Sequence, residues 1–271
     1  MTKKAVNGST HTVQITRVTR EGREFREDRV AQEEPLEIRI DGRPVAITMR
    51  TPGHDLELAA GFLYTEGVID GVDDIRALAH VDDPADPQGN TVDTVLSGGV
   101  PAARRSKADR ALFASSSCGV CGKASIDRLL VGAPPLSNRI KVDPDIMLDL
   151  PNRLRQAQSV FDQTGGLHAA ALFDPTGEIE VTREDIGRHN AVDKVIGWRL
   201  REDRVPIDDR ILLVSGRAGF EIIQKALVAR IGVVAAVGAP SSMAVQLAEQ
   251  SGMTLVGFLR DGRYNQYGGH Q

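Results

Sequence analysis

From residue 210 to residue 259, strand-like and helix-like segments alternate with only short loops between them. Apolar runs predict strands, and apolar residues at helical spacing predict helices. The expected strands cover 210–215, 233–237 and 254–259, and the expected helices cover 220–231 and 240–250. This alternation is typical of a parallel sheet covered by helices. We therefore expect an α/β arrangement for the C-terminal part of the chain.

The residues before 210 favour a mixed, α+β organisation. Further strands are expected at 13–20, 165–173 and 179–183, a hairpin at 37–49 around Asp41-Gly42, a broken strand pair at 75–96, and helices at 54–65, 123–130, 144–159 (interrupted near Pro151) and from about 191 to 200. Asp-Gly between alternating runs is a strong hairpin signal. We expect a disordered tail at 1–12, an N-terminal α+β domain at 13–145 and a second domain at 146–271.

The two cysteines of the chain, Cys118 and Cys121, lie three residues apart in Ser-Ser-Ser-Cys-Gly-Val-Cys-Gly-Lys. Serine and glycine neighbours cannot form an apolar core, so we expect an exposed, reactive pair on a mobile loop at about 98–123. Half of a metal site, a redox pair of the thioredoxin type and inert thiols remain alternatives. A structural disulfide is disfavoured because it would close only a tiny loop.

Two glycine-containing loops follow expected strands and precede expected helices. The first is Ser215-Gly216-Arg217-Ala218-Gly219, and the second is Gly238-Ala239-Pro240-Ser241-Ser242. The start of a helix offers unpaired backbone N–H groups to an anion, so the two loops indicate an anionic or nucleotide ligand. Tight turns that simply require glycine are the alternative.

Polar residues gather just before the helix expected at 191. His189 is a candidate proton donor or general base there, whereas Glu184 and Asp185 are equally explained as helix caps. A satisfied core histidine is the favoured interpretation of His168.

Charge and hydropathy exclude some classes of protein. The formal net charge of −4 gives no general attraction to nucleic acid. Apolar runs long enough to span a membrane are missing, and the N-terminus lacks the apolar core of a signal peptide. We therefore expect a cytoplasmic protein that acts without nucleic acid or membrane.

Five motifs together resemble the formate dehydrogenase accessory sulfurtransferase family, FdhD. They are Ser-Ser-Cys-Gly-Val-Cys-Gly at 116–122, Thr-Gly-Gly-Leu-His-Ala-Ala at 164–170, Glu-Asp-Ile-Gly-Arg-His-Asn-Ala-Val-Asp-Lys at 184–194, Ser-Gly-Arg-Ala-Gly-Phe-Glu at 215–221 and Gly-Ala-Pro-Ser-Ser at 238–242. The resemblance implies a sulfurtransferase that takes persulfide sulfur from a cysteine desulfurase. The acceptor it implies is the molybdenum bis-molybdopterin guanine dinucleotide cofactor of formate dehydrogenase.

The same resemblance implies a homodimer, a C-terminal domain like the cytidine deaminases, and roles for particular residues. Cys118 corresponds to the persulfide cysteine, with Cys121 beside it. Cofactor contacts are expected from Phe258, Leu259, Arg260, Asp261, Gly262 and Arg263, together with Ser215, Gly216, Arg217 and His189.

The sequence also distinguishes the expected sulfur transfer from other activities. Zinc deaminases need His-x-Glu and Pro-Cys-x-x-Cys, and both patterns are missing here, so the deaminase likeness concerns the fold alone. No metal site is expected, because the histidines lack ligand spacing. The alternative function is a non-catalytic chaperone that binds the cofactor for formate dehydrogenase maturation, and a thioredoxin-like oxidoreductase ranks third.

Overall fold

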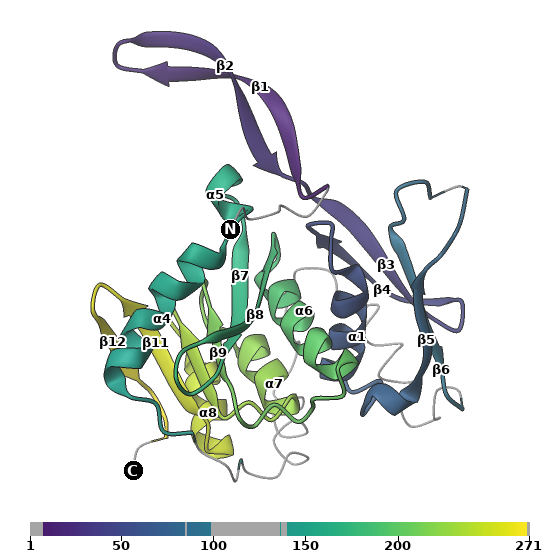
Figure 1. Cartoon of the computed structure of the whole chain (residues 1–271), viewed down its shortest axis with the longest axis vertical. Helices are drawn as coiled ribbons and strands as arrows, with labels where there is room; N and C mark the ends of the chain where they lie inside the picture. The colour runs from purple at the N-terminus through teal and green to yellow at the C-terminus, as the bar shows by residue number, and fades with distance from the viewer. Residues whose placement is uncertain (1–7, 85, 99–135, 137–139, 270–271) are drawn as a thin grey trace.

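The computed structural model of the chain describes residues 8–84, 86–98, 136 and 140–269, and these residues form three sheets. A six-stranded sheet and a four-stranded sheet make up the body of the molecule, and a two-stranded hairpin extends away from it (Figure 1). The two cysteines and the helix expected at 123–130 lie outside the described residues. In the part of the chain that is described, no helix is long and apolar enough to cross a membrane.

The six-stranded sheet contains every strand after residue 165. Its order is β12 (Arg263–Gln266), β11 (Thr254–Arg260), β10 (Val233–Ala236), β9 (Ile211–Val214), β7 (His168–Phe173) and β8 (Ile179–Asp185). The three central strands β9, β10 and β11 are parallel, as predicted. The outer strands β7, β8 and β12 are antiparallel to their neighbours, so the sheet is mixed rather than wholly parallel.

Helices cover both faces of this sheet. Helices α6 (Arg188–Arg201), α7 (Phe220–Val228) and α8 (Ser242–Ser251) pack on one face, within the larger apolar core. Helix α4 (Pro144–Ala157) covers the other face through Met147, Leu150 and Leu154, and the short α5 (Phe161–Thr164) follows it. The result is three layers, whereas the likeness to cytidine deaminases remains a prediction.

Two predicted helices have different limits from those expected. Helix α4 runs through Pro151 without interruption, because burial of its apolar stripe outweighs the one hydrogen bond that proline removes. Helix α6 begins at Arg188 instead of about 191, after Gly187 at the N-cap position. The earlier start places His189 in the first turn of the helix.

The N-terminal sheet is smaller and is covered by one helix. Its order is β4 (Arg43–Arg50), β3 (Glu34–Ile40), β6 (Thr91–Leu96) and β5 (Ile75–His80), with α1 (Asp55–Thr65) and the 3-10 turn η1 (Val72–Asp74) between strands. The predicted hairpin turn is confirmed: Asp41 and Gly42 have φ values of 48° and 77°. Both residues therefore take the left-handed conformation that such a turn requires.

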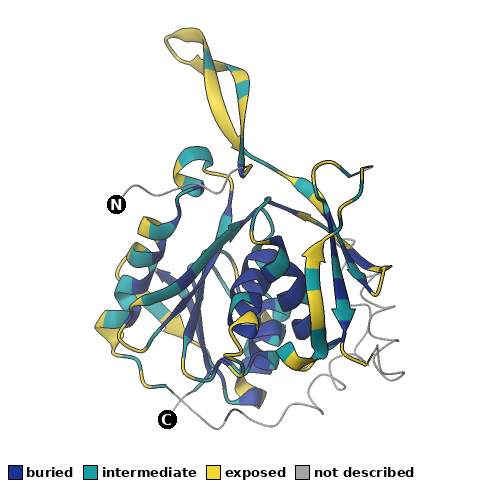
Figure 2. Cartoon of the chain, turned by 45° about the vertical axis from the view of Figure 1, so that its right-hand side comes forward, coloured by how far each residue is buried: buried dark blue, intermediate teal, exposed yellow. Residues whose placement is uncertain are grey.

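Helices α1 and α6 join the two halves of the body. Gly61 in α1 and Gly197 in α6 lie at the crossing, where a Cβ on either would overlap the backbone of the other helix. The apolar core is accordingly continuous, since residues of both helices and both sheets belong to it (Figure 2). The expected boundary near 145 separates two sheets that share one core.

The hairpin arm consists of β1 (Thr10–Thr19) and β2 (Gly22–Ala31), paired antiparallel along their whole length. The tail predicted for 1–12 is therefore too long, because β1 begins at Thr10. The arm points away from the body, and most of its residues are exposed on both faces (Figure 2). Within the described residues, its strands pair with no other strand.

Candidate functional site

The parallel strands β9, β10 and β11 bring three predicted site segments to one edge of the sheet. Val214 and Ala236 are register partners at the ends of β9 and β10, so the loops that follow begin side by side. The Gly238 N–H donates to Gly216 O at 2.9 Å, and the Phe258 N–H donates to Gly238 O at 3.0 Å. Backbone hydrogen bonds thus connect the Ser215–Gly219 loop, the Gly238 loop and β11, at the edge where open α/β sheets bind ligands.

The glycines in these loops are required by close packing. A Cβ on Gly238 would lie 2.8 Å from Gly216 O, and a Cβ on Gly216 would lie 3.2 Å from His168 Nδ1. The two loops also pair at Ala218 and Pro240. Tight packing explains these two glycines without a ligand, and it also fixes the positions of the groups around them.

Three helices start beside this edge, and two of them lack a side-chain cap. The N-cap residues of α6 and α7 are Gly187 and Gly219, which offer no side-chain acceptor. Helix α8 differs, because Ser241 Oγ accepts a hydrogen bond from Ala244 N. The first N–H groups of α6 and α7 consequently remain suited to an anion.

Cationic and imidazole side chains surround the Gly216 loop. Burial lowers the pKa of His168, and the positive charges of Arg188, His189 and Arg217 lower it further. Arg188 Cδ would lie 3.8 Å from a Cβ on Gly216. Its Nε is buried and has no hydrogen-bond partner among the described residues. This group of side chains is therefore electropositive and contains a donor without an acceptor.

His189 is paired with a carboxylate on the next helix. Its Nε2 lies 3.0 Å from Glu221 Oε2 in the first turn of α7. The hydrogen bond from His189 is the main reason that the pKa of Glu221 lies below its ordinary value. The contact places an imidazole, a side chain type that can exchange protons, beside the cationic group.

Ser215 has a structural contact. Its Oγ accepts a hydrogen bond from Ala169 N at 2.8 Å, and its own N–H donates to Ala169 O at 2.9 Å. The side chain therefore links the end of β9 to β7.

The segment Phe258–Arg263 forms the β11–β12 hairpin, with Asp261 and Gly262 at its turn. Arg260 and Arg263 are register partners, both are exposed, and the Arg260 guanidinium lies 5.9 Å from the centre of the Phe258 ring. Leu259 is fully buried against the α4 side of the sheet. Phe258, the two arginines and Asp261 are hence the members of this segment whose side chains are open to a ligand, and Asp261 Oδ2 lies 3.9 Å from Arg260 Nε.

A buried ionic network holds the start of α6 in place, and the sequence did not reveal it. Asp185 is buried with its carboxylate 2.7 Å from Lys194 Nζ, and it accepts hydrogen bonds from Thr51 N and Gly187 N. Lys194 Nζ in turn donates to Thr51 O at 2.9 Å. Asp185 is therefore a structural anchor for the turn before Arg188 and His189, and not a helix cap. The sequence signal for this network was the presence of Lys194 in the 184–194 motif.

Glu184 also has a structural partner. Its carboxylate accepts hydrogen bonds from Val160 N at 2.9 Å and Phe161 N at 2.8 Å, at the start of α5. Cys118 and Cys121, the predicted catalytic pair, lie outside the described residues. In the described ranges, no group of three or more His, Cys, Asp or Glu side chains could hold a metal ion.

Comparisons with known proteins give one consistent family. Residues 31–271 match the model of the FdhD/NarQ family. The sulfur carrier protein FdhD of Streptomyces coelicolor is 49% identical over 90% of this chain and 88% of its own. The sulfur carrier protein FdhD of Sulfurisphaera tokodaii is 42% identical over 94% of this chain and 95% of its own.

A solved structure has the same fold. The crystal structure from Desulfotalea psychrophila, described as that of a formate dehydrogenase accessory protein, superposes with a TM-score of 0.76. The likeness covers 96% of this chain and 97% of that one, at 24% sequence identity.

Proposed function

The chain belongs to the FdhD/NarQ family, and from this premise we propose that it is a sulfur carrier for formate dehydrogenase maturation. In this proposal it accepts persulfide sulfur from a cysteine desulfurase. It then transfers that sulfur to the molybdenum bis-molybdopterin guanine dinucleotide cofactor, which is its substrate. The names of its relatives support the carrier role, and the donor and acceptor are our inference.

The chemistry of sulfur receipt requires one thiolate. The Cys118 thiolate attacks the outer sulfur of the donor persulfide, a new S–S bond forms, and the cysteine thiolate of the donor leaves with the electron pair of the broken bond. In the second transfer the S–S bond of the Cys118 persulfide would break, the Cys118 thiolate would leave with its electron pair, and the acceptor cofactor would supply the electron pair for its new bond to the outer sulfur. Cys121 is close enough in sequence to attack the persulfide as a resolving thiol. Both cysteines are assigned these roles from the sequence.

The observation that carries the cofactor part of the proposal is the meeting of the Gly216 loop, the Gly238 loop and Phe258 at one sheet edge. A bis-guanine dinucleotide carries four phosphate groups as pyrophosphates, and such anions favour uncapped helix starts and arginines. Helices α6 and α7 start at this edge, and Arg188, Arg217 and Arg260 lie around it. Phe258 offers a ring for stacking.

In this proposal His189, paired with Glu221, has a role in proton transfer as well as in binding. Transfer of sulfur from a persulfide leaves a thiolate on the carrier, and a nearby proton donor stabilises that product. The His189 imidazole lies beside the proposed cofactor edge, with its Nε2 3.0 Å from Glu221 Oε2. We assign His189 as that donor.

The test is the intact mass of the protein after incubation with a cysteine desulfurase and cysteine. A carrier gains sulfur on this treatment, and the gain disappears on reduction. Cys118→Ala is expected to abolish the gain, and Cys121→Ala serves as the matched control that retains it. Absence of any gain in the unmodified chain would contradict the carrier role and leave a cofactor-binding chaperone.

A further inference from the structure

The hairpin arm presents an unpaired strand edge far from the proposed site. A two-stranded hairpin is at best marginally stable in water, and its edges are open to pairing with another chain. The side chains of Phe25 and Val18 lie on the same face of the arm, where they are 87% and 66% exposed. The arm ends at Ala31, where the match to the family model begins.

Charged residues of opposite sign lie at equal sequence separations on the two sides of Phe25. Glu24 and Arg26 flank it, Arg23 and Glu27 follow, and beyond them Glu21 mirrors Arg29. If β2 paired antiparallel with β2 of another molecule around a two-fold axis at Phe25, every one of these charges would face its opposite. Strand pairs with opposite charges are stabilising, and like charges are destabilising.

Other registers lack this complementarity. A shift by one residue in one direction brings Glu24 opposite Glu27 of the second copy, and a shift in the other direction brings Arg23 opposite Arg26. The Phe25-centred register also places the two Phe25 rings together on one face. The pattern therefore favours a second copy of this chain in one specific alignment, with the self-complementary geometry of a two-fold interface.

We propose that β2 is a homodimerisation strand, which pairs with β2 of a second copy to give a four-stranded sheet in the order β1, β2, β2, β1. The pairing covers the exposed edge of each arm and the exposed Phe25. The two paired arms run in opposite directions, so that the tip of each arm reaches the base of the other.

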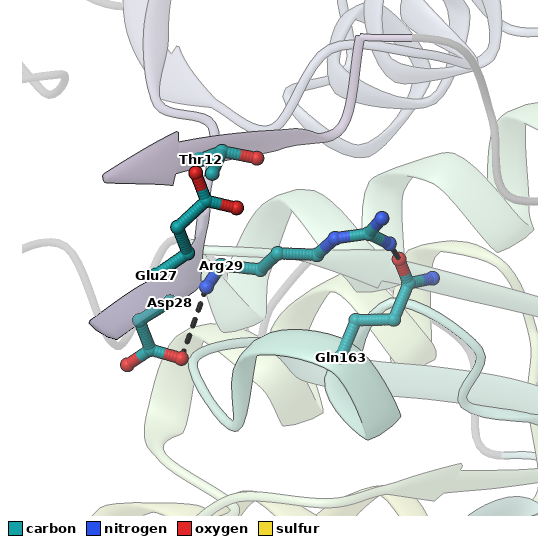
Figure 3. A pocket seen from close by; sticks show the side chains of 5 residues that line it. All are labelled: Thr12, Glu27, Asp28, Arg29 and Gln163. Carbon is teal, nitrogen blue, oxygen red and sulfur yellow. Dashed lines mark hydrogen bonds between the residues drawn. The ribbon is translucent and has the colours of Figure 1, made fainter. Parts of the chain in front are cut away.

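A pocket at the base of the arm suits the incoming tip. It has a volume of about 250 Å³ and is lined by Thr12, Glu27, Asp28, Arg29 and Gln163 (Figure 3). Arg29 Nη1 donates to Gln163 Oε1 at 2.6 Å, which connects the arm to α5. The proposed register brings Arg23 of the second copy opposite Glu27 and its Gly22 opposite Asp28. The Arg23 guanidinium of the second copy thus meets the Glu27 carboxylate of the pocket.

Charge reversal tests the pairing. Glu27→Arg also removes the hydrogen bond from Gln14 Nε2 to Glu27 Oε1 within the arm, so Arg23→Glu is the cleaner of the two single variants. Arg23 is opposite Val18 and Glu27 is opposite Gln14 within the arm, so neither has a charged partner directly across its own hairpin. Arg23→Glu alone, or Glu27→Arg alone, puts like charges opposite each other twice in a dimer. Each is expected to weaken dimerisation at least about tenfold in sedimentation equilibrium of the full chain.

Two combinations restore the attraction. The double variant Arg23→Glu with Glu27→Arg is expected to dimerise like the unmodified chain. An equimolar mixture of the two single variants is expected to form a heterodimer, since each then faces the opposite charge. A monomeric unmodified chain, single variants that dimerise normally, or combinations that fail to recover would each overturn the proposal.

Crosslinking tests the register directly. In the Cys118→Ser/Cys121→Ser background, Phe25→Cys places two Cβ atoms about 4.5–5.5 Å apart across the axis, and mild oxidation is expected to give a covalent dimer. Glu21→Cys is the matched control, because its two copies lie about 26 Å apart along the strands. Equal crosslinking at the two positions, or none at Phe25→Cys, would overturn the register. Sulfur loading of Cys118 is measured separately, so failure here leaves the carrier proposal standing.

Discussion

Asp185 and Lys194 form a buried ion pair, with the carboxylate 2.7 Å from Nζ and both side chains almost completely hidden from solvent. The pair lies beneath the start of α6 and is hydrogen-bonded to the backbone of Thr51, which follows β4 of the other sheet. It therefore connects the two sheets at the base of the proposed cofactor edge.

Removal of the Asp185 carboxylate is expected to lower the free energy of unfolding substantially. Asp185→Asn leaves the Lys194 ammonium buried without its counter-charge, which costs about 3–5 kcal/mol of unfolding free energy. Urea denaturation followed by circular dichroism measures it. Glu178→Gln is the control, because Glu178 pairs with Arg153 at an exposed site and should cost less than about 1 kcal/mol. Equal effects of the two variants would contradict the structural role of Asp185.

The crossing of α1 and α6 gives a second stability prediction. Gly61→Ala introduces a methyl group where the backbone at Asp193 already lies, so the helices must separate. We expect a loss of about 3 kcal/mol or more, since overpacking against backbone has no flexible side chain to absorb it. Gly71→Ala has open space around its Cβ and is expected to change stability by less than about 0.5 kcal/mol. Thermal or urea unfolding of both variants distinguishes a tight crossing from a loose one.

The predictable parts of the fold are those that local chemistry determines. Asp41-Gly42 fixes its hairpin because few other residues accept two left-handed conformations in a row. The loops at Gly216 and Gly238 were found because strand, glycine and helix follow one another in the sequence. Their meeting with Phe258 follows from parallel strands ending at one edge.

The parts that escaped prediction depend on tertiary contacts or lack an apolar face. Strand β2 was missed because its charges lie on both faces, so it has no alternation of apolar and polar residues. The Asp185 network involves Thr51, which is 134 residues away in sequence, and no local pattern indicates such a partner. The pairing of His189 with Glu221 likewise depends on how α6 and α7 pack.

Acid stability should depend on Glu57. Burial alone would raise the pKa of this carboxyl, but hydrogen bonds from Arg183 and His54 outweigh burial and lower it to about 2. Between the unfolded pKa of 4.5 and about 2, only the unfolded chain binds the proton, so stability is lost as the pH falls through this window. The full loss is about 3 kcal/mol. Glu57→Gln should flatten the stability profile there, and an unchanged slope would contradict the assignment.

The last prediction concerns the arginines of the β11–β12 hairpin. Guanine nucleotides should raise the melting temperature of the protein, because a ligand that binds only the folded state stabilises it. We expect GDP to give a larger shift than ADP. Arg260→Ala with Arg263→Ala removes two exposed guanidinium groups beside Phe258 and should abolish the GDP shift.

The matched control removes the same charge from the other sheet. Arg43→Ala with Arg76→Ala deletes two exposed arginines of the N-terminal sheet and should leave the GDP shift intact. Sulfur loading of Cys118 should persist in both double variants, because sulfur receipt and nucleotide binding are assigned to different segments. A GDP shift that survives Arg260→Ala with Arg263→Ala would remove this hairpin from the cofactor site. Loss of the shift in both double variants would indicate a general effect of charge and not a site at β11–β12.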